Sequence, residues 1–295
     1  QIAWYCMLTV SYIRADQVVG SDFRWFYAVG TVWRQYGPGK VYDLRLAGIT
    51  QAQVAGVPVG SERILLPNHP PFVFPVMALL AGLAFRSAYL LNFILVWLIT
   101  ASVMVGMYRS LRKRGWPRFE ALAFFCGVLL FEPFFMSVLK GQDTYLLLVG
   151  GLFLFFGFLE DRDWLAGLGL GLMLIRPQIA LVLALPFLFR KRTVWWWFIA
   201  AAFLLGIYSF IQVGWNGARD YVAILKLSTG VQGFGWDEPG MFDSVGMLLR
   251  VAPGLGAGLI HDIGWGCYGA VLAGLCLLWW RAKTIQFRHL SLAVT

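Results

Sequence analysis

Long uninterrupted apolar runs are the feature of this sequence that most limits how the chain can fold. Residues 88–108, 119–139, 194–213 and 264–280 each reach or approach the roughly 20 residues that a helix needs to cross a bilayer core. The run from Trp164 to Phe189 is too long for one ordinary crossing and contains Arg176-Pro177, so we expect a broken helix or a helical hairpin there. With shorter runs at 2–13 and 144–159, the sequence predicts an all-α polytopic membrane protein with seven or eight transmembrane helices in one domain, residues 1–295.

The charge content supports this assignment. Charged residues make up only 13% of the chain, against about 25% in soluble domains, which is too little to cover a water-soluble surface. The net charge of +9 is carried largely by short connections at residues 109–118, 190–192 and 281–283, which the positive-inside rule assigns to the cytoplasm. Residues 14–86, the turn at 140–143 and residues 214–262 then lie outside. We expect a multi-pass protein of the cell membrane, of a bacterial inner membrane, with no nucleic-acid partner.

The first exterior segment is expected to carry helices that lie at the membrane surface. Ser21 can cap a helix that continues to Tyr36 and presents an aromatic stripe, and the sequence Gly37-Pro38-Gly39 stops it. The apolar run from Pro70 to Phe85 begins with two prolines and is interrupted by a third, so we expect it to lie along or dip into the outer leaflet without crossing.

Three acidic residues lie at or near membrane depth, where an ionisable group is costly and is a functional candidate by default. Asp22 follows the first span, Glu132 lies within an apolar run, and Asp143 lies in an exterior turn. Two of them have a structural alternative. Asp22 could be a first-turn carboxylate favoured by the helix dipole, and Glu132 could pair with a neighbouring helix.

Arg176 is the basic counterpart of these residues. Helix breaks in membranes usually line a polar cavity, where an arginine offers a planar, permanently charged fork for a phosphate. The alternative is a simple kink from which the side chain reaches the interface. His69 could line a sugar site or be an ordinary interfacial histidine. No metal-ligand spacing involves the histidines or the four cysteines, so no metal or other cofactor is expected.

The order of these features resembles the polyprenol-phosphate-mannose-dependent transferases of glycosyltransferase family 87, in the GT-C superfamily. The resemblance extends over residues 20–230 and departs from the family pattern in two places, a basic-Pro pair that is Arg-Pro instead of Lys-Pro and an Asp-Thr after the Gly-Gln turn. Four motifs carry it: Asp22-Phe23-Arg24-Trp25-Phe26-Tyr27 with Tyr42-Asp43, His69-Pro70-Pro71, Gly141-Gln142-Asp143-Thr144, and Leu165-Ala166-Gly167 leading to Arg176-Pro177.

The resemblance implies a GT-C-like bundle and an inverting transfer of a mannose-like hexose from a polyprenyl phosphate to an acceptor hydroxyl at the exterior face. Asp22 would be the general base, and no divalent metal is needed because a monophosphate leaves. The donor phosphate would bind Arg176, Lys140 and Arg24, and the substrates Gln142, Asp143, Tyr27, Asp43, His69 and Glu132. Lipids and other membrane proteins are the expected partners. Two alternatives remain from the residues alone: a non-catalytic subunit of a larger membrane assembly, or a lipid or solute transporter, although no inverted repeat is visible.

Overall fold

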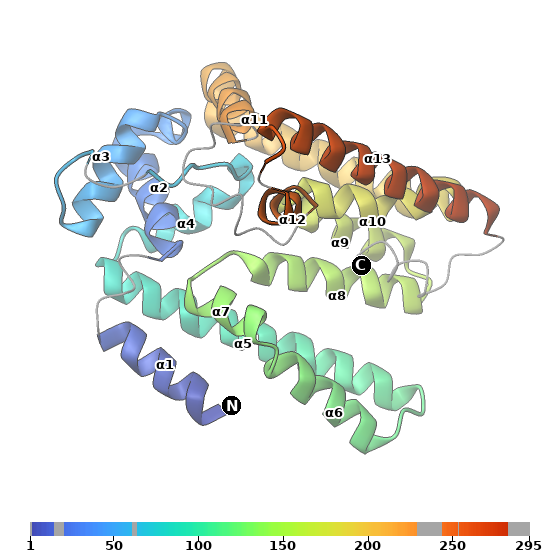
Figure 1. Cartoon of the computed structure of the whole chain (residues 1–295). Helices are drawn as coiled ribbons and strands as arrows, with labels where there is room; N and C mark the ends of the chain where they lie inside the picture. The colour runs from blue at the N-terminus through green and yellow to red at the C-terminus, as the bar shows by residue number, and fades with distance from the viewer. Residues whose placement is uncertain (1, 15–20, 61–63, 229–243, 253, 283–295) are drawn as a thin grey trace.

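The computed structural model describes residues 2–14, 21–60, 64–228, 244–252 and 254–282. Parts of the two segments expected outside, 14–86 and 214–262, lie outside the described residues, as does Lys283. Within the described ranges every regular element is a helix, which confirms the all-α prediction (Figure 1). The α-helices and the short 3-10 helices (η) are α1 (Ile2–Arg14), α2 (Phe23–Tyr36), η2 (Pro38–Lys40), α3 (Leu44–Ala55), η3 (Pro71–Val73), α4 (Phe74–Leu80), α5 (Phe85–Lys113), α6 (Arg118–Leu129), α7 (Glu132–Leu139), α8 (Thr144–Leu159), α9 (Asp163–Leu172), η4 (Met173–Ile175), α10 (Pro177–Phe189), α11 (Arg192–Ser228), α12 (Ser244–Val251) and α13 (Ala257–Arg281).

Fewer helices than expected are long enough to cross a membrane unaided. Among the described residues, α5, α11 and α13 meet the length and hydropathy requirement, and α6 with α7 would add a fourth span. The other apolar helices are 10–17 residues long, which at 1.5 Å per residue gives roughly 15–25 Å, less than a hydrocarbon core of about 30 Å. The chain is polytopic, as predicted, and in the described residues three or four of its apolar stretches are long enough to span while the others form shorter helices.

The expected span over residues 119–139 consists of two helices, α6 and α7. The chain bends by 53° between α6 and α7, because α7 restarts at Glu132-Pro133 and proline can occupy the first turn of a helix but cannot continue one. The hydroxyl of Tyr5 on α1 donates to the carbonyl of Leu130 at 2.9 Å, which satisfies a backbone group that the bend exposes.

The basic connections gather at one end of the helices, which we call the basic end. The Arg114 guanidinium donates to the Leu159 carbonyl at 3.1 Å, so the ends of α5 and α8 meet there. The Lys191 ammonium lies 2.5 Å from a carboxylate oxygen of Asp161, and Arg190 donates to the carbonyl that follows α13. α5, α8, α10 and α13 therefore all finish at the basic end.

The apolar run around Arg176 is a helical hairpin. Lys191, after α10, also lies 3.7 Å from Asp163, which opens α9, so the two ends of the run meet at the basic end. η4 and Arg176, which link α9 to α10, therefore form the tip at the opposite end. Of the two forms left open by the sequence, a broken single span is excluded by this contact.

Glycines let α9 pack closely against its neighbours on two sides. An ideal Cβ at Gly169 would lie 2.5 Å from the Gly150 carbonyl oxygen on α8, and one at Gly167 would lie 2.8 Å from the Phe198 nitrogen on α11. Backbone atoms cannot move away from such a contact, so any side chain there would separate the helices. This spacing explains the Gly-Leu-Gly-Leu-Gly pattern as a packing motif.

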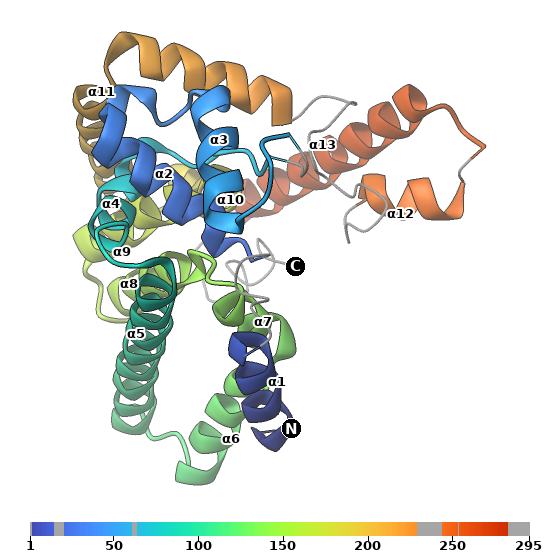
Figure 2. The ribbon, with the colours of Figure 1, turned by 90° about the vertical axis from the view of Figure 1, so that its left-hand side faces the viewer.

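The surface helices α2, α3 and α4 pack together beside the start of α5 (Figure 2). α2 ends where expected, since Gly37 has a φ of +87°, a conformation that glycine adopts readily. Its start differs from the prediction: the residue at the N-cap position is Asp22 and not Ser21, and its side chain makes no capping hydrogen bond. The run from Pro70 to Phe85 forms only η3, α4 and a turn, too short to cross, as expected.

Candidate active site

The carboxylate of Asp22 is held by a residue far away in the sequence. The side-chain nitrogen Nε2 of Gln142 donates to Asp22 Oδ2 at 2.5 Å, across a separation of 120 residues. The Ser137 hydroxyl donates to Gln142 Oε1 at 2.8 Å, which fixes the amide with its nitrogen toward the carboxylate. Asp22 stands at the start of α2 but makes no capping hydrogen bond, and its side chain contacts Gln142.

The turn between α7 and α8 is built to receive the start of α2. The backbone N–H of Phe23 donates to the Lys140 carbonyl at 3.0 Å. Gly141 has a φ of +68°, and an ideal Cβ on it would lie 2.7 Å from the Phe23 Cβ, so glycine meets both a conformational and a spatial requirement. This docking brings Asp22 and Gln142 together.

Asp143, the next residue, continues the polar contacts toward the hairpin tip. Its side chain is 2% exposed. Oδ1 accepts a hydrogen bond from Arg176 Nη2 at 3.2 Å, and Oδ2 lies 2.7 Å from His69 Nε2. Consecutive residues of one turn therefore connect Asp22 on one side with Arg176 and His69 on the other. We call this group the polar cluster: Asp22, His69, Ser137, Gln142, Asp143 and Arg176.

Arg176 sits at the hairpin tip because Pro177 begins α10 there. Arg176 has non-helical dihedral angles (φ −123°, ψ 82°), which suit the residue before a proline. Its side chain is 33% exposed, so the guanidinium pairs with Asp143 while part of it stays accessible. A guanidinium has five N–H donors, and the single contact with Asp143 leaves others for an anion.

His69 is enclosed by aromatic side chains of α2. Its ring centroid lies 4.8 Å from that of Trp25 and 5.2 Å from that of Phe26. The Tyr42 hydroxyl donates to the His69 carbonyl at 2.7 Å, and burial raises the pKa of this hydroxyl well above its usual range, so it remains a donor. These contacts fix the loop that places His69 next to Asp143.

Two apolar cavities lie beside the polar cluster. The first, which we call the α11 groove, has a volume of about 320 Å³ and is lined by α11 together with Pro70, Pro71 and Leu174. These residues neighbour His69 and Arg176 in the chain. A hydrocarbon chain in the α11 groove would therefore begin close to the cation of the cluster.

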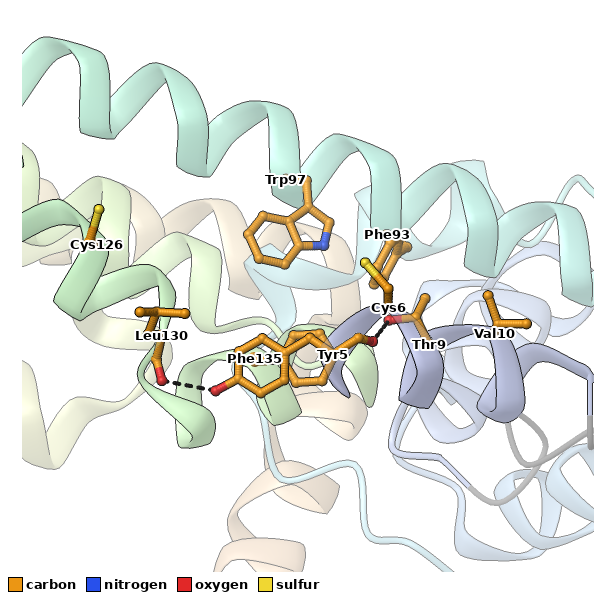
Figure 3. Close-up of a pocket in the computed structure, with 9 residues that line it drawn as sticks. All are labelled: Tyr5, Cys6, Thr9, Val10, Phe93, Trp97, Cys126, Leu130 and Phe135. Atoms are coloured by element: carbon orange, nitrogen blue, oxygen red, sulfur yellow. Dashed lines mark hydrogen bonds between the residues drawn. The ribbon is translucent and has the colours of Figure 1, made fainter. Parts of the chain in front are cut away.

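The second, the α1 cavity, has a volume of about 510 Å³ and lies between α1, α5, α6 and α7 (Figure 3). The rings of Tyr5 and Phe135 stack at 4.0 Å on one side, and Trp97 faces them from α5 (Figure 3). Phe93 lines the cavity and stacks on Tyr89, which packs edge-on against Phe23, the neighbour of Asp22. Aromatic side chains therefore separate this cavity from the polar cluster.

Several residues expected at the site have other surroundings. Glu132 is exposed in the first turn of α7, at the end away from Gln142, and the exposed Lys140 meets α2 through its carbonyl. The other three residues, Arg24, Tyr27 and Asp43, lie on or next to α2 and α3. The Tyr27 hydroxyl donates to the Leu83 carbonyl, and Asp43 caps α3 by accepting from the backbone N–H groups of Arg45 and Leu46. Arg24 is buried and lines a cavity beside α3.

Sequence reasoning missed Ser137. The available signal was a hydroxyl in an otherwise apolar helix, five residues before Gln142. A serine in this position can equally bond to the backbone of its own helix, and the sequence does not distinguish the two cases. Across the described residues, no three His, Cys, Asp or Glu side chains are grouped as metal ligands would be.

The family model for glycosyltransferase family 87 matches residues 68–295. The matched segment contains His69, Gln142, Asp143 and Arg176, and it extends through α12 and α13, beyond the 20–230 of the resemblance. Asp22 and the surface helices α2 and α3 precede it. No curated protein and no solved structure matches the chain significantly.

Proposed function

The chain belongs to glycosyltransferase family 87 and is a membrane glycosyltransferase, and we propose that it transfers a hexose from a polyprenyl-phosphate donor to an acceptor hydroxyl. The observation that carries the proposal is the polar cluster. Gln142 contacts the carboxylate of Asp22, which can accept a proton. The next residue, Asp143, contacts the guanidinium of Arg176, which can bind a phosphate. The mannose-like identity of the hexose follows from the family resemblance.

In the proposed reaction, Asp22 is the general base. Gln142 contacts Oδ2, and we give the acceptor proton to Oδ1 as the acceptor oxygen bonds to the anomeric carbon. The bond from that carbon to the phosphate oxygen breaks on the opposite face, and its electron pair leaves with the phosphate, which inverts the configuration. The carboxylate acts as a base and not as a nucleophile, so no covalent sugar intermediate forms.

Arg176 is the proposed site of the donor phosphate. The phosphate gains negative charge as it leaves, and a preorganised guanidinium stabilises that charge. Lys140, exposed on the same turn as Gln142, is the second candidate cation. Because phosphate contacts of this kind require only protein cations, we propose that no metal takes part. The polyprenyl chain would enter the α11 groove, whose lining includes residues next to both His69 and Arg176.

The face of the membrane follows from the basic end. The polar cluster lies at the end of α8 and α10 opposite to the basic connections. With those connections in the cytoplasm, the proposed site opens to the exterior of a cell membrane, a bacterial inner membrane by the resemblance.

The test is a transfer assay with a radiolabelled prenyl-phosphate hexose and purified protein in lipid vesicles. We expect Asp22→Asn to lower kcat about 10²- to 10⁴-fold, the contribution of a general base. Asp161→Asn, the same chemical change at the basic end, serves as the matched control and should leave transfer unchanged. Wild-type turnover in correctly folded Asp22→Asn would refute the assignment of the base.

A second variant tests the phosphate site. Arg176→Lys keeps the charge but loses the fork, so donor binding should weaken while the fold is retained. We expect the donor KM to rise and the acceptor KM to stay the same. An unchanged donor KM would remove Arg176 from the phosphate site and leave Asp22 untested by this variant.

A further inference from the structure

Asp143 is a buried carboxylate shared by two groups that can each carry positive charge. Its side chain is 2% exposed, Oδ1 faces Arg176 and Oδ2 faces His69. A carboxylate removed from water needs a compensating charge. Arg176 supplies one permanently, and His69 supplies one whenever its ring is protonated.

The two contacts differ in length. The distance from His69 Nε2 to Asp143 Oδ2 is 2.7 Å, an ion-pair distance when the ring is protonated. The distance from Arg176 Nη2 to Asp143 Oδ1 is 3.2 Å, longer than about 2.9 Å, and it is a single contact and not a bidentate one. Arg176 therefore forms a hydrogen bond to Asp143, and His69 lies at ion-pair distance from its other oxygen.

In the described part of the chain, the His69 ring contacts the Asp143 carboxylate and two aromatic rings of α2. The side chains of α2 that pack on the ring are Trp25 and Phe26, which are uncharged. The Tyr42 hydroxyl bonds to the backbone carbonyl of His69 and not to its ring. Arg176 lies beyond Asp143. The side chain is 5% exposed, so water screens little of the interaction between these charges.

We propose that His69 is a positioning residue that controls donor binding through Asp143 and Arg176, an inference that rests on the proposed phosphate site at Arg176. When His69 is protonated it balances Asp143, and the charge of Arg176 is left for the phosphate. When His69 is neutral, Arg176 must balance Asp143. The summed charge of these three side chains is +1 in the first state and 0 in the second.

The consequence is a donor affinity that depends on pH. Histidine changes charge between about pH 5 and 8, whereas the donor is a phosphodiester with one constant negative charge in that range. We expect the donor KM to rise about tenfold from pH 5.5 to 8.5. This is roughly the effect of one charge at about 10 Å with an effective dielectric constant near 20.

The experiment measures the donor KM and kcat against pH for the wild type, His69→Gln, Asp143→Asn and the matched control His261→Gln on α13. Gln at position 69 carries no charge, so the donor KM of this variant should be flat and equal to the high-pH value of the wild type. Asp143→Asn breaks the link and should also give a flat KM. His261→Gln should follow the wild type.

Two results would overturn the inference: a flat donor KM in the wild type, or a wild-type pH profile in folded His69→Gln. Thermal unfolding and gel filtration establish whether each variant is folded. If His69→Gln does not fold, the pH profile of Asp143→Asn is the test. Failure of the proposed function looks different, since the wild type would then transfer no hexose at any pH.

If the wild type transfers no hexose, the effect of His69 on phosphate binding at Arg176 can still be measured by ligand binding. The probe is farnesyl methyl phosphate, a prenyl phosphodiester without a sugar, and the readout is its thermal stabilisation of the protein. Greater stabilisation at pH 5.5 than at 8.5 in the wild type, but not in His69→Gln, supports the inference. Equal stabilisation at both pH values in the wild type overturns it.

Discussion

Replacing Gln142 by Met tests whether the contact to Asp22 prepares the base for catalysis. Methionine has a similar length and no amide, so the change removes the 2.5 Å hydrogen bond to Asp22 and the one from Ser137 while it keeps most of the volume. A hydrogen bond to a charged group contributes about 1.5–3 kcal/mol. If all of this free energy is lost from the transition state in the variant, kcat should fall about 10- to 150-fold.

The assay is the transfer reaction at saturating donor, because Gln142 contacts the base and not the guanidinium. The donor KM should stay within about twofold, since uniform binding is unaffected. Ser137→Ala removes only the neutral bond that orients the amide, whose contribution is about 0.5–1.5 kcal/mol, so its loss in kcat should be smaller, about 2- to 12-fold.

A double-mutant cycle decides between positioning and general damage. In the Asp22→Asn background Gln142 no longer has a carboxylate to hold, so Gln142→Met should cost little more. If Gln142→Met lowers kcat by the same factor in both backgrounds, or leaves it unchanged in the wild type, the reasoning about the polar cluster is refuted.

Three further predictions concern stability and titration. Gly169→Ala places a Cβ 2.5 Å from the α8 backbone, and the unfolding free energy should fall by about 3 kcal/mol or more, measured by denaturant unfolding in micelles. Tyr42→Phe leaves the His69 carbonyl without its donor and should cost about 1–3 kcal/mol in the same measurement. The hydrogen bond from Lys191 lowers the pKa of Asp161; in Lys191→Met an NMR titration should show that pKa higher, and an unchanged value contradicts the contact.

The local features of the fold were readable from the sequence because they depend on neighbouring residues. α8 has the predicted bounds, and the break at Arg176-Pro177 follows from a proline that lacks an N–H. The bend between α6 and α7 had a similar signal in Pro133, but a helical first turn tolerates proline, so the residue alone does not say whether a span continues or restarts.

The pairing within the site could be predicted only in part. Aspartate at the start of α2 is equally suited to a helix cap, and its turn toward Gln142 depends on how the α7–α8 turn docks against Phe23. The contact of His69 with Asp143 likewise depends on the packing of α2 aromatics around the ring. Arg24, Tyr27 and Asp43 share the same motif-bearing segment but have other partners, because successive helical positions point in different directions.

The hairpin of α9 and α10 has a mechanical consequence for the enzyme. Both arms meet at the basic end and the guanidinium lies at the opposite tip, so the position of the tip depends on how the arms sit along their neighbours. A slip of one residue moves it by about 1.5 Å, comparable to the 1 Å misplacement that costs an enzyme about a hundredfold in rate. The close glycine contacts of α9 with α8 and α11 resist such sliding, so under the proposed function they would hold the phosphate site in position relative to Asp22.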